Sequence, residues 1–272
     1  MGKIRLGQRA QALKQELRED FPLGRFIPSG LTLLGLCCGA TAIRFALFGN
    51  WHAAVAAIVC AAVFDLLDGR VARLFGVDSK FGAQLDSLAD LVSFGIAPSV
   101  IVYTWTLYQA RGAGWAAVLV FCICCAIRLA RFNVESAEHD PDEPKEPYFV
   151  GLPTPAAACL ILLPMLLGFQ FRDKLFSDPL LSAVMIAVMS CLMVSRLPTL
   201  SLKSLHIPRR LKAPLVAFAG LMLGFAILWP WSTLTIGLLL YLVSIPVAVA
   251  SFSEMRRNRA RSSVDPDDLE DF

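Results

Sequence analysis

Eight long apolar stretches most constrain what this chain of 272 residues can fold into. The hydrocarbon core of a bilayer is about 30 Å thick, and roughly 20 apolar residues cross it as an α-helix. The chain is 56% hydrophobic and only 17% charged, whereas about 25% of the residues of a soluble domain are charged. We therefore predict an all-α, polytopic membrane helix bundle. The expected spans are approximately residues 30–48, 51–68, 89–108, 114–132, 154–171, 180–197, 213–230 and 232–250.

The distribution of Lys and Arg predicts how these helices are oriented. With eight spans, both termini lie on one side of the membrane. That side holds 21 of the 25 Lys and Arg residues once the charged helix ends are assigned to it. Because basic residues are retained on the cytoplasmic side, we expect both termini to face the cytoplasm, in the cell inner (cytoplasmic) membrane. A seven-span arrangement would move one basic terminus to the opposite side, and we reject it for that reason.

Three segments are expected along the chain. Residues 1–29 form a cytoplasmic N-terminal segment, for which a short helix at the membrane interface and a solvated charged arm are alternative interpretations. The membrane domain occupies residues 30–252. Residues 253–272 are first basic and then acidic, without apolar periodicity, so we expect a disordered charged tail.

Two short motifs in the apolar stretches carry weaker information. Gly35 and Gly39, and likewise Gly220 and Gly224, have the GxxxG spacing at which two membrane helices can pack closely. The CxxC within residues 122–125 lies inside an expected span, without a second pair of cysteines or a histidine cluster nearby. We interpret it as apolar packing rather than as a zinc or redox site.

Four aspartates interrupt the apolar pattern between the second and third spans. The first two are three residues apart and the last two are four apart, so each pair shares one face of its helix. We expect the second helix to continue past the membrane surface, and "GVDSKFG" to turn the chain back. All four carboxylates would then meet at the cytoplasmic end of two antiparallel helices. These residues are Asp65, Asp68, Asp86 and Asp90.

Such a group of carboxylates requires a counter-charge, because neighbouring anions in a partly dehydrated site repel one another. The single positive charge of Arg73 is too small to balance four carboxylates. Carboxylate oxygens without His or Cys are ligands that suit Mg²⁺ or Mn²⁺, and a pair of such ions suits phosphoryl transfer. The alternative is that the aspartates only cap helices and form ion pairs at a helix hairpin.

From Asp65 to Asp90 the chain reads D-x2-DG-x2-AR-x8-G-x3-D-x3-D. This pattern resembles the signature of the CDP-alcohol phosphotransferases at every fixed position. The resemblance implies transfer of a phosphatidyl-type group from a CDP-linked lipid to an alcohol, with release of CMP. It also implies that the four aspartates bind two divalent metal ions, Mg²⁺ or Mn²⁺, and that Asp90 is the general base. Gly69, Arg73 and Ser79 match positions that contact the cytidine diphosphate part of CDP-diacylglycerol.

Other segments bear on the acceptor alcohol. "RLARFNV" at 128–134 and "YFVGLPTPAAA" at 148–158 resemble bacterial, membrane-type members of the family that use L-serine and form phosphatidylserine. Those members often carry Asn where Ser29 stands here. Serine has a carboxylate that calls for a fixed cation, and Arg128 and Arg131 could supply bidentate contacts. Alternatively, these arginines only anchor the helix end at lipid headgroups.

Several alternatives stay open at this point. The basic residues of 203–212 could bind a phosphorylated acceptor, so a synthase that uses glycerol 3-phosphate or inositol is the main rival. A membrane transporter is a more distant alternative, because the acidic residues gather at one membrane face and not at the midplane. Membrane lipids are expected partners and nucleic acids are not. The resemblance implies a homodimer.

Overall fold

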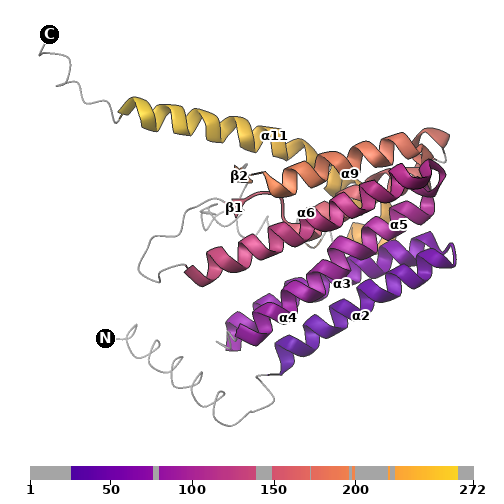
Figure 1. The fold of residues 1–272 in the computed structure, drawn as a ribbon, viewed down its shortest axis with the longest axis horizontal. Coiled ribbons are helices and arrows are strands. Elements are labelled where there is room, and N and C mark those ends of the chain that lie inside the picture. The colour runs from indigo at the N-terminus through magenta and orange to yellow at the C-terminus, as the bar shows by residue number, and fades with distance from the viewer. Residues whose placement is uncertain are drawn as a thin grey trace, which may run out of the picture.

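Long helices that run back and forth make up most of the chain (Figure 1). The computed structural model describes residues 26–75, 80–138, 149–171, 173–195, 198–199, 220 and 224–262. The α-helices are α2 (Ile27–Leu47), α3 (Trp51–Phe75), α4 (Lys80–Asp90), α5 (Ala97–Trp105), α6 (Arg111–Glu138), α7 (Thr154–Ile161), α8 (Leu163–Phe171), α9 (Pro179–Val194) and α11 (Pro230–Ser262). The shorter helices are the π-helix η2 (Leu91–Ile96) and the 3₁₀-helices η3 (Leu107–Ala110) and η4 (Lys174–Ser177).

The prediction of an all-α fold is confirmed, apart from one very short strand pair. β1 (Phe149–Val150) pairs antiparallel with β2 (Pro198–Thr199). This pair lies at the same end of the bundle at which α2 and α4 begin and α3 and α6 end (Figure 1). Ends of these four helices and the two short strands therefore lie at one end of the bundle.

Among the described residues, four helical stretches are long and apolar enough to cross a membrane: Ile27–Leu47, Phe81–Trp105, Leu107–Glu135 and Thr154–Phe171. Shorter apolar helices occupy Pro179–Val194 and Pro230–Pro246. Each expected span except one therefore corresponds to one helix or to consecutive helices, including α3, which continues past residue 68 as expected. The exception is residues 213–230, most of which lie outside the described residues. The membrane class is confirmed, and the eight-span topology stays a prediction.

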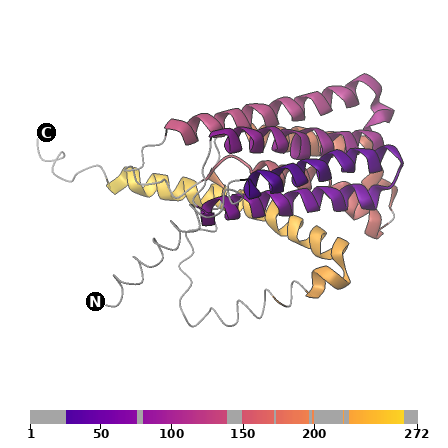
Figure 2. The ribbon, with the colours of Figure 1, turned by 90° about the horizontal axis from the view of Figure 1, so that it is seen from below.

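The C-terminal helix is longer than expected. α11 continues to Ser262, into the segment 253–272 for which the sequence predicts a disordered tail. Arg, which occurs four times between Met255 and Ser262, is a good helix former. The later part of α11, in yellow, extends beyond the end of the bundle at which α6 ends (Figure 1 and Figure 2). Residues 1–25 and 263–272, which carry the rest of the predicted terminal segments, lie outside the described residues.

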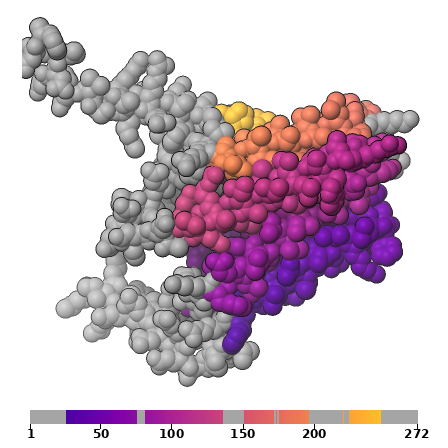
Figure 3. Space-filling model, in the orientation of Figure 1, coloured from indigo at the N-terminus to yellow at the C-terminus, as the bar shows by residue number. Residues whose placement is uncertain are grey.

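Apolar side chains are exposed along the outer helices, as lipid contact requires. α6 and α9 form part of the face seen in Figure 3. A soluble monomer rarely exposes large apolar patches, so this surface fits a protein whose solvent is a bilayer. The exposed apolar residues include Leu119, Val120, Ile123 and Ile127 on α6 and Val184 and Val188 on α9.

The glycines of α2 allow a very close helix contact. A Cβ added at Gly39 would lie 2.5 Å from Ser93 Oγ and 2.7 Å from Ser93 Cα. The Ser93 hydroxyl donates to the Gly35 carbonyl at 3.3 Å. The prediction that this GxxxG pair forms a packing face is confirmed. A Cβ at Gly224, in the second pair, would meet nothing within 4 Å among the described residues.

A π-helical turn interrupts the third expected span directly after Asp90. Pro98 has no N–H, and in a regular α-helix its ring would clash with the carbonyl four residues earlier. The chain adjusts upstream of Pro98 by forming η2, and the Ser99 hydroxyl donates to the carbonyls of Gly95 and Ile96 at 2.8 and 2.9 Å. The sequence predicts one uninterrupted helix over 89–108, and Pro98 is the signal that indicates otherwise.

Candidate metal and substrate site

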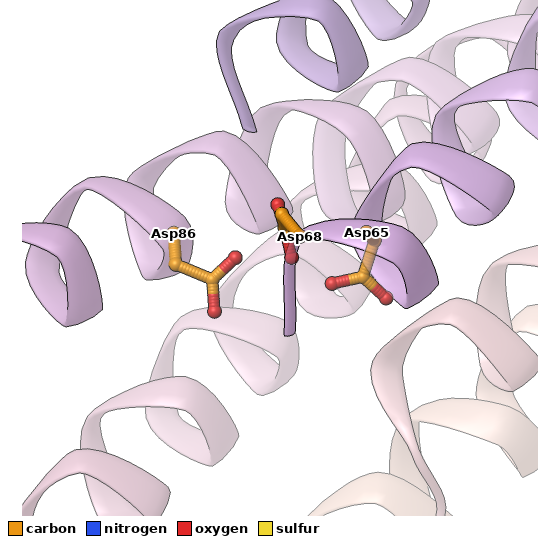
Figure 4. A group of neighbouring side chains, drawn as sticks. All are labelled: Asp65, Asp68 and Asp86. Atoms are coloured by element: carbon orange, nitrogen blue, oxygen red, sulfur yellow. The ribbon is translucent and has the colours of Figure 1, made fainter. Parts of the chain in front are cut away.

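Two neighbouring helices bring three acidic side chains together. Asp65 and Asp68 lie on α3 and Asp86 lies on α4. One carboxylate oxygen from each lies within 4.8 Å of the others. In Figure 4, the carboxylates of Asp65 and Asp86 point toward each other from opposite sides of Asp68. We call these three residues the acidic cluster. The spacing in the sequence predicts this convergence.

Asp90 lies beside the acidic cluster rather than within it. It ends α4, one turn after Asp86, and lines the same pocket as the three clustered aspartates. Asp90 interacts electrostatically with all three of them and also with Arg128 of α6. The fourth carboxylate is therefore within electrostatic range of both the acidic cluster and a cation on another helix.

The pocket is small and its polar atoms are incompletely satisfied. It contains about 190 Å³ of space not filled by atoms, part of which is open to the outside. Asp68 is only 5% exposed, and Asp86 Oδ1 is buried without a hydrogen-bond partner in the part of the chain that the structure describes. A buried carboxylate oxygen without a partner is costly, and like charges nearby raise that cost. A divalent cation that binds oxygen ligands would relieve both effects, so the acidic cluster fits Mg²⁺ or Mn²⁺.

Helix α2 adds a residue that the sequence analysis missed. The Thr32 hydroxyl donates to Asp68 Oδ2 at 2.8 Å. Thr32 is 7% exposed and lines the pocket. Its signal in the sequence is a polar side chain inside the apolar stretch "PSGLTLLGLCCG". That signal does not reveal a partner 36 positions away on another helix.

The residues expected to contact cytidine diphosphate follow the acidic cluster along α3. Gly69 is half-buried and Arg73, one turn later, is exposed. Arg73 Nε donates to the Gly69 carbonyl at 2.8 Å. Among the described residues, a Cβ added at Gly69 would meet only Arg73 Nη2, at 3.7 Å, so the glycine leaves space open there next to Asp68. Ser79 lies outside the described residues.

Helix α6 holds the two arginines of "RLARFNV" in different surroundings. Arg128 Nη1 donates to Thr154 Oγ1, at the start of α7. Its Nε is buried and has no hydrogen-bond partner among the described residues, and the guanidinium interacts electrostatically with Asp90 and with Tyr241 of α11. Arg131 Nη1 instead donates to the Val194 carbonyl at 3.1 Å, at the C-terminal end of α9. Arg128 thus faces the acidic residues, whereas Arg131 links α6 to α9.

A side-chain pair fixes α4 against α6. Asn133 Nδ2 donates to Ser87 Oγ at 2.9 Å, and Ser87 Oγ lies 3.1 Å from Asn133 Oδ1. Ser87 directly follows Asp86 in the chain, and Asn133 lies in the same stretch as the two arginines. This contact holds the acidic side chains of α4 in position relative to the cations of α6. The sequence analysis identified the stretch that contains Asn133 but did not predict its contact with Ser87.

A comparison with protein families agrees with this geometry. The family described as CDP-alcohol phosphatidyltransferase matches residues 25–195, which include all four aspartates. This chain belongs to the CDP-alcohol phosphatidyltransferase family. The match ends before α11, so the Tyr241 near Arg128 lies outside the part of the chain that defines the family.

Curated relatives within this family come from several bacteria. A Mycobacterium leprae protein named CDP-diacylglycerol–serine O-phosphatidyltransferase is 36% identical over 225 residues, which cover 83% of this chain and 75% of the relative. A Bacillus subtilis protein of the same name is 36% identical over 63% of this chain and 88% of the relative. One from Helicobacter pylori is 38% identical over 62% of this chain and 70% of the relative.

Proposed function

We propose that this protein transfers a phosphatidyl group from CDP-diacylglycerol to the hydroxyl of L-serine, releasing CMP and forming phosphatidylserine. The observation that carries the choice of serine is the name shared by the relatives. Proteins from three bacterial genera, 36–38% identical to this chain, are all named for serine. The acidic cluster and the adjacent Arg128 support the chemistry.

The four aspartates would bind two divalent metal ions, Mg²⁺ or Mn²⁺. The three carboxylate oxygens within 4.8 Å of one another and the unpartnered oxygen of Asp86 support this proposal. When bound, such ions neutralise pyrophosphate oxygens and the negative charge on departing CMP. Gly69, Arg73 and Ser79 would contact the cytidine diphosphate part. The missing side chain at Gly69 allows the nucleotide to approach the helix, and the exposed Arg73 guanidinium is available to phosphate oxygens.

Asp90 would be the general base. In this step, the serine hydroxyl oxygen forms a bond to the lipid-side phosphorus and the bond from that phosphorus to the CMP oxygen breaks. The hydroxyl proton moves to the Asp90 carboxylate. The electrostatic interactions of Asp90 with the acidic cluster and with Arg128 support this role, because they bring this carboxylate within range of both proposed binding groups.

Arg128 would bind the carboxylate of serine. Its Nε is buried without a partner, so a carboxylate that accepts this N–H removes an unsatisfied donor. Its neighbour Thr154 begins α7, and the N-terminal N–H groups of a helix attract negative charge. Arg131 would support the same pocket, because its hydrogen bond to Val194 fixes α6 against α9.

The membrane arrangement that accompanies this function has eight spans, with both termini and the pocket facing the cytoplasm in the inner membrane. The excess of Lys and Arg on one side supports it. The common end at which α2 and α4 begin and α3 and α6 end also supports it (Figure 1). We further propose a homodimer, the assembly that the family resemblance implies. Native mass spectrometry in detergent tests the dimer, and cysteine accessibility at each terminus tests the topology.

An acceptor assay tests the reaction. The purified protein with CDP-diacylglycerol and Mn²⁺ or Mg²⁺ is expected to release CMP with L-serine, and mass spectrometry is expected to detect phosphatidylserine. Glycerol 3-phosphate and inositol serve as competing acceptors in parallel reactions. Faster CMP release with either of them than with serine would overturn the assignment of the acceptor while leaving the family chemistry in place.

A further inference from the structure

A hydroxyl on α2 reaches the most buried aspartate of the acidic cluster. Thr32 Oγ1 lies 2.8 Å from Asp68 Oδ2 and 3.1 Å from the Pro28 carbonyl oxygen. We propose that Thr32 is a positioning residue for metal binding, which holds one oxygen of Asp68 so that the other faces the acidic cluster. This inference rests on the proposed metal site and adds to it a residue on a third helix.

The hydrogen bond to Asp68 is favoured over the one to Pro28. A hydroxyl carries a single proton, and an ionised carboxylate is a stronger acceptor than a backbone carbonyl. Thr32 and Asp68 are 7% and 5% exposed, so water competes little for either group. A hydrogen bond in such surroundings is electrostatically stronger than one in water. Thr32 is also β-branched, which restricts the rotation of its side chain in a helix.

The packing of α2 fixes the distance across which this hydrogen bond forms. A Cβ added at Gly35 would lie 3.5 Å from Phe64 Cβ and 3.6 Å from the Ala61 carbonyl oxygen, so α2 and α3 are in contact one turn from Thr32. Phe64 is in turn four residues before Asp68 on α3. The hydroxyl and the carboxylate are therefore held by two rigid helices and not by a loop.

The same helix offers a matched control. The Thr41 hydroxyl donates to the Cys37 carbonyl at 2.6 Å, which is the same local bond that Thr32 can form with Pro28. Thr41 is exposed, and its hydroxyl bond is local to α2. Replacing each threonine by valine therefore separates the effect of the contact with Asp68 from that of a bond within the helix.

The test measures Mn²⁺ binding to the full-length, detergent-purified protein without substrate, by the loss of the free Mn²⁺ signal in electron paramagnetic resonance. Removing a residue that orients a metal ligand typically weakens metal affinity by about 10–100-fold. We expect Thr32→Val to weaken Mn²⁺ binding by about 10-fold. Thr32→Ser keeps the hydroxyl and is expected to stay within about 2-fold of the wild type, as is Thr41→Val.

A second readout is the dependence of CMP release on Mn²⁺. We expect Thr32→Val to raise the Mn²⁺ concentration for half-maximal rate by about the same factor as the binding constant. Raising the Mn²⁺ concentration is expected to recover most of the lost rate, because the variant retains all four carboxylates. If Thr32→Val does not fold, Thr32→Ala removes the same hydroxyl with less bulk and is expected to weaken Mn²⁺ binding similarly.

Distinct results overturn the inference. Wild-type Mn²⁺ affinity in Thr32→Val, or equal weakening in Thr32→Val and Thr32→Ser, excludes a role for the hydroxyl and refutes this inference alone. An increase only in the KM for CDP-diacylglycerol, with normal Mn²⁺ affinity, assigns Thr32 to the nucleotide instead. A wild-type protein that binds no Mn²⁺ refutes the proposed metal site together with this inference.

Discussion

Replacing Arg128 by alanine tests the acceptor pocket most directly. The carboxylate of serine would accept hydrogen bonds from Nε, which is buried without a partner, and from a second N–H of the guanidinium. Hydrogen bonds to charged groups contribute about 1.5–3 kcal/mol each. We take the lower value for each of the two bonds, which gives about 3 kcal/mol for the pair. At about 1.4 kcal/mol per factor of ten, this corresponds to a roughly 100-fold increase in the KM for serine.

The assay measures CMP release while serine and CDP-diacylglycerol are varied separately. Because Arg128 also interacts with Asp90, kcat is expected to decrease as well. The diagnostic quantity is therefore the change in the KM for serine relative to that for CDP-diacylglycerol. Arg128→Lys keeps the charge but loses the two-point geometry of the guanidinium, so it is expected to recover only part of the affinity.

Arg131→Ala is the matched comparison on the same helix. Its guanidinium already donates to the carbonyl of Val194, so we expect an increase in the KM for serine of less than about tenfold, which is typical of one lost hydrogen bond. That increase should still exceed the change in the KM for CDP-diacylglycerol. Equal effects of Arg128→Ala on the two KM values would refute the assignment of this residue to serine. A larger effect at Arg131 would move the carboxylate to that residue.

Three further predictions concern the base, the metal ions and the helix packing. Asp90→Asn is expected to lower kcat by about 10²–10⁴-fold, the usual contribution of a general base, and near-normal turnover would exclude that role. Treatment with a chelator should abolish CMP release, and added Mn²⁺ or Mg²⁺ should restore it; activity that survives chelation would contradict the metal proposal. Gly39→Ala places a Cβ 2.5 Å from Ser93 Oγ and is expected to destabilise the fold by about 1–3 kcal/mol. Gly30→Ala, which meets nothing within 4 Å among the described residues, should not lower the midpoint of thermal unfolding, and equal effects of both substitutions would contradict the packing argument.

The helices and the acidic cluster could be predicted because both depend on local spacing. Apolar length fixes where a chain can cross a bilayer, and spacings of three and four residues place Asp65 with Asp68 and Asp86 with Asp90. A helix hairpin then brings the two pairs together, and the three clustered carboxylates follow this reasoning. Apolar length predicts the ends of the helices less well. For example, α4 begins at Lys80, well before the apolar stretch.

The contacts between distant helices could not be predicted in the same way. The Thr32–Asp68 hydrogen bond and the Arg131–Val194 hydrogen bond depend on how each helix is rotated about its axis. That rotation is set by tertiary packing, such as the approach of Gly39 to Ser93, and no local pattern encodes it. For this reason, the sequence does not distinguish the cation at Arg128 from that at Arg131, whereas in the structure Arg128 interacts electrostatically with Asp90 and Arg131 bonds to Val194.

The π turn after Asp90 changes how the two halves of this membrane helix, before and after the turn, are rotated relative to each other. Each residue of an α-helix advances the angle around the axis by about 100°, and a π turn holds one residue more than an α turn. The side chains of the polar half and those of the apolar half can therefore point in directions that a continuous α-helix would not allow. Deleting one residue within Leu91–Ile96 would rotate Asp86 and Asp90 away from Asp65, while the apolar half would keep its position in the bundle.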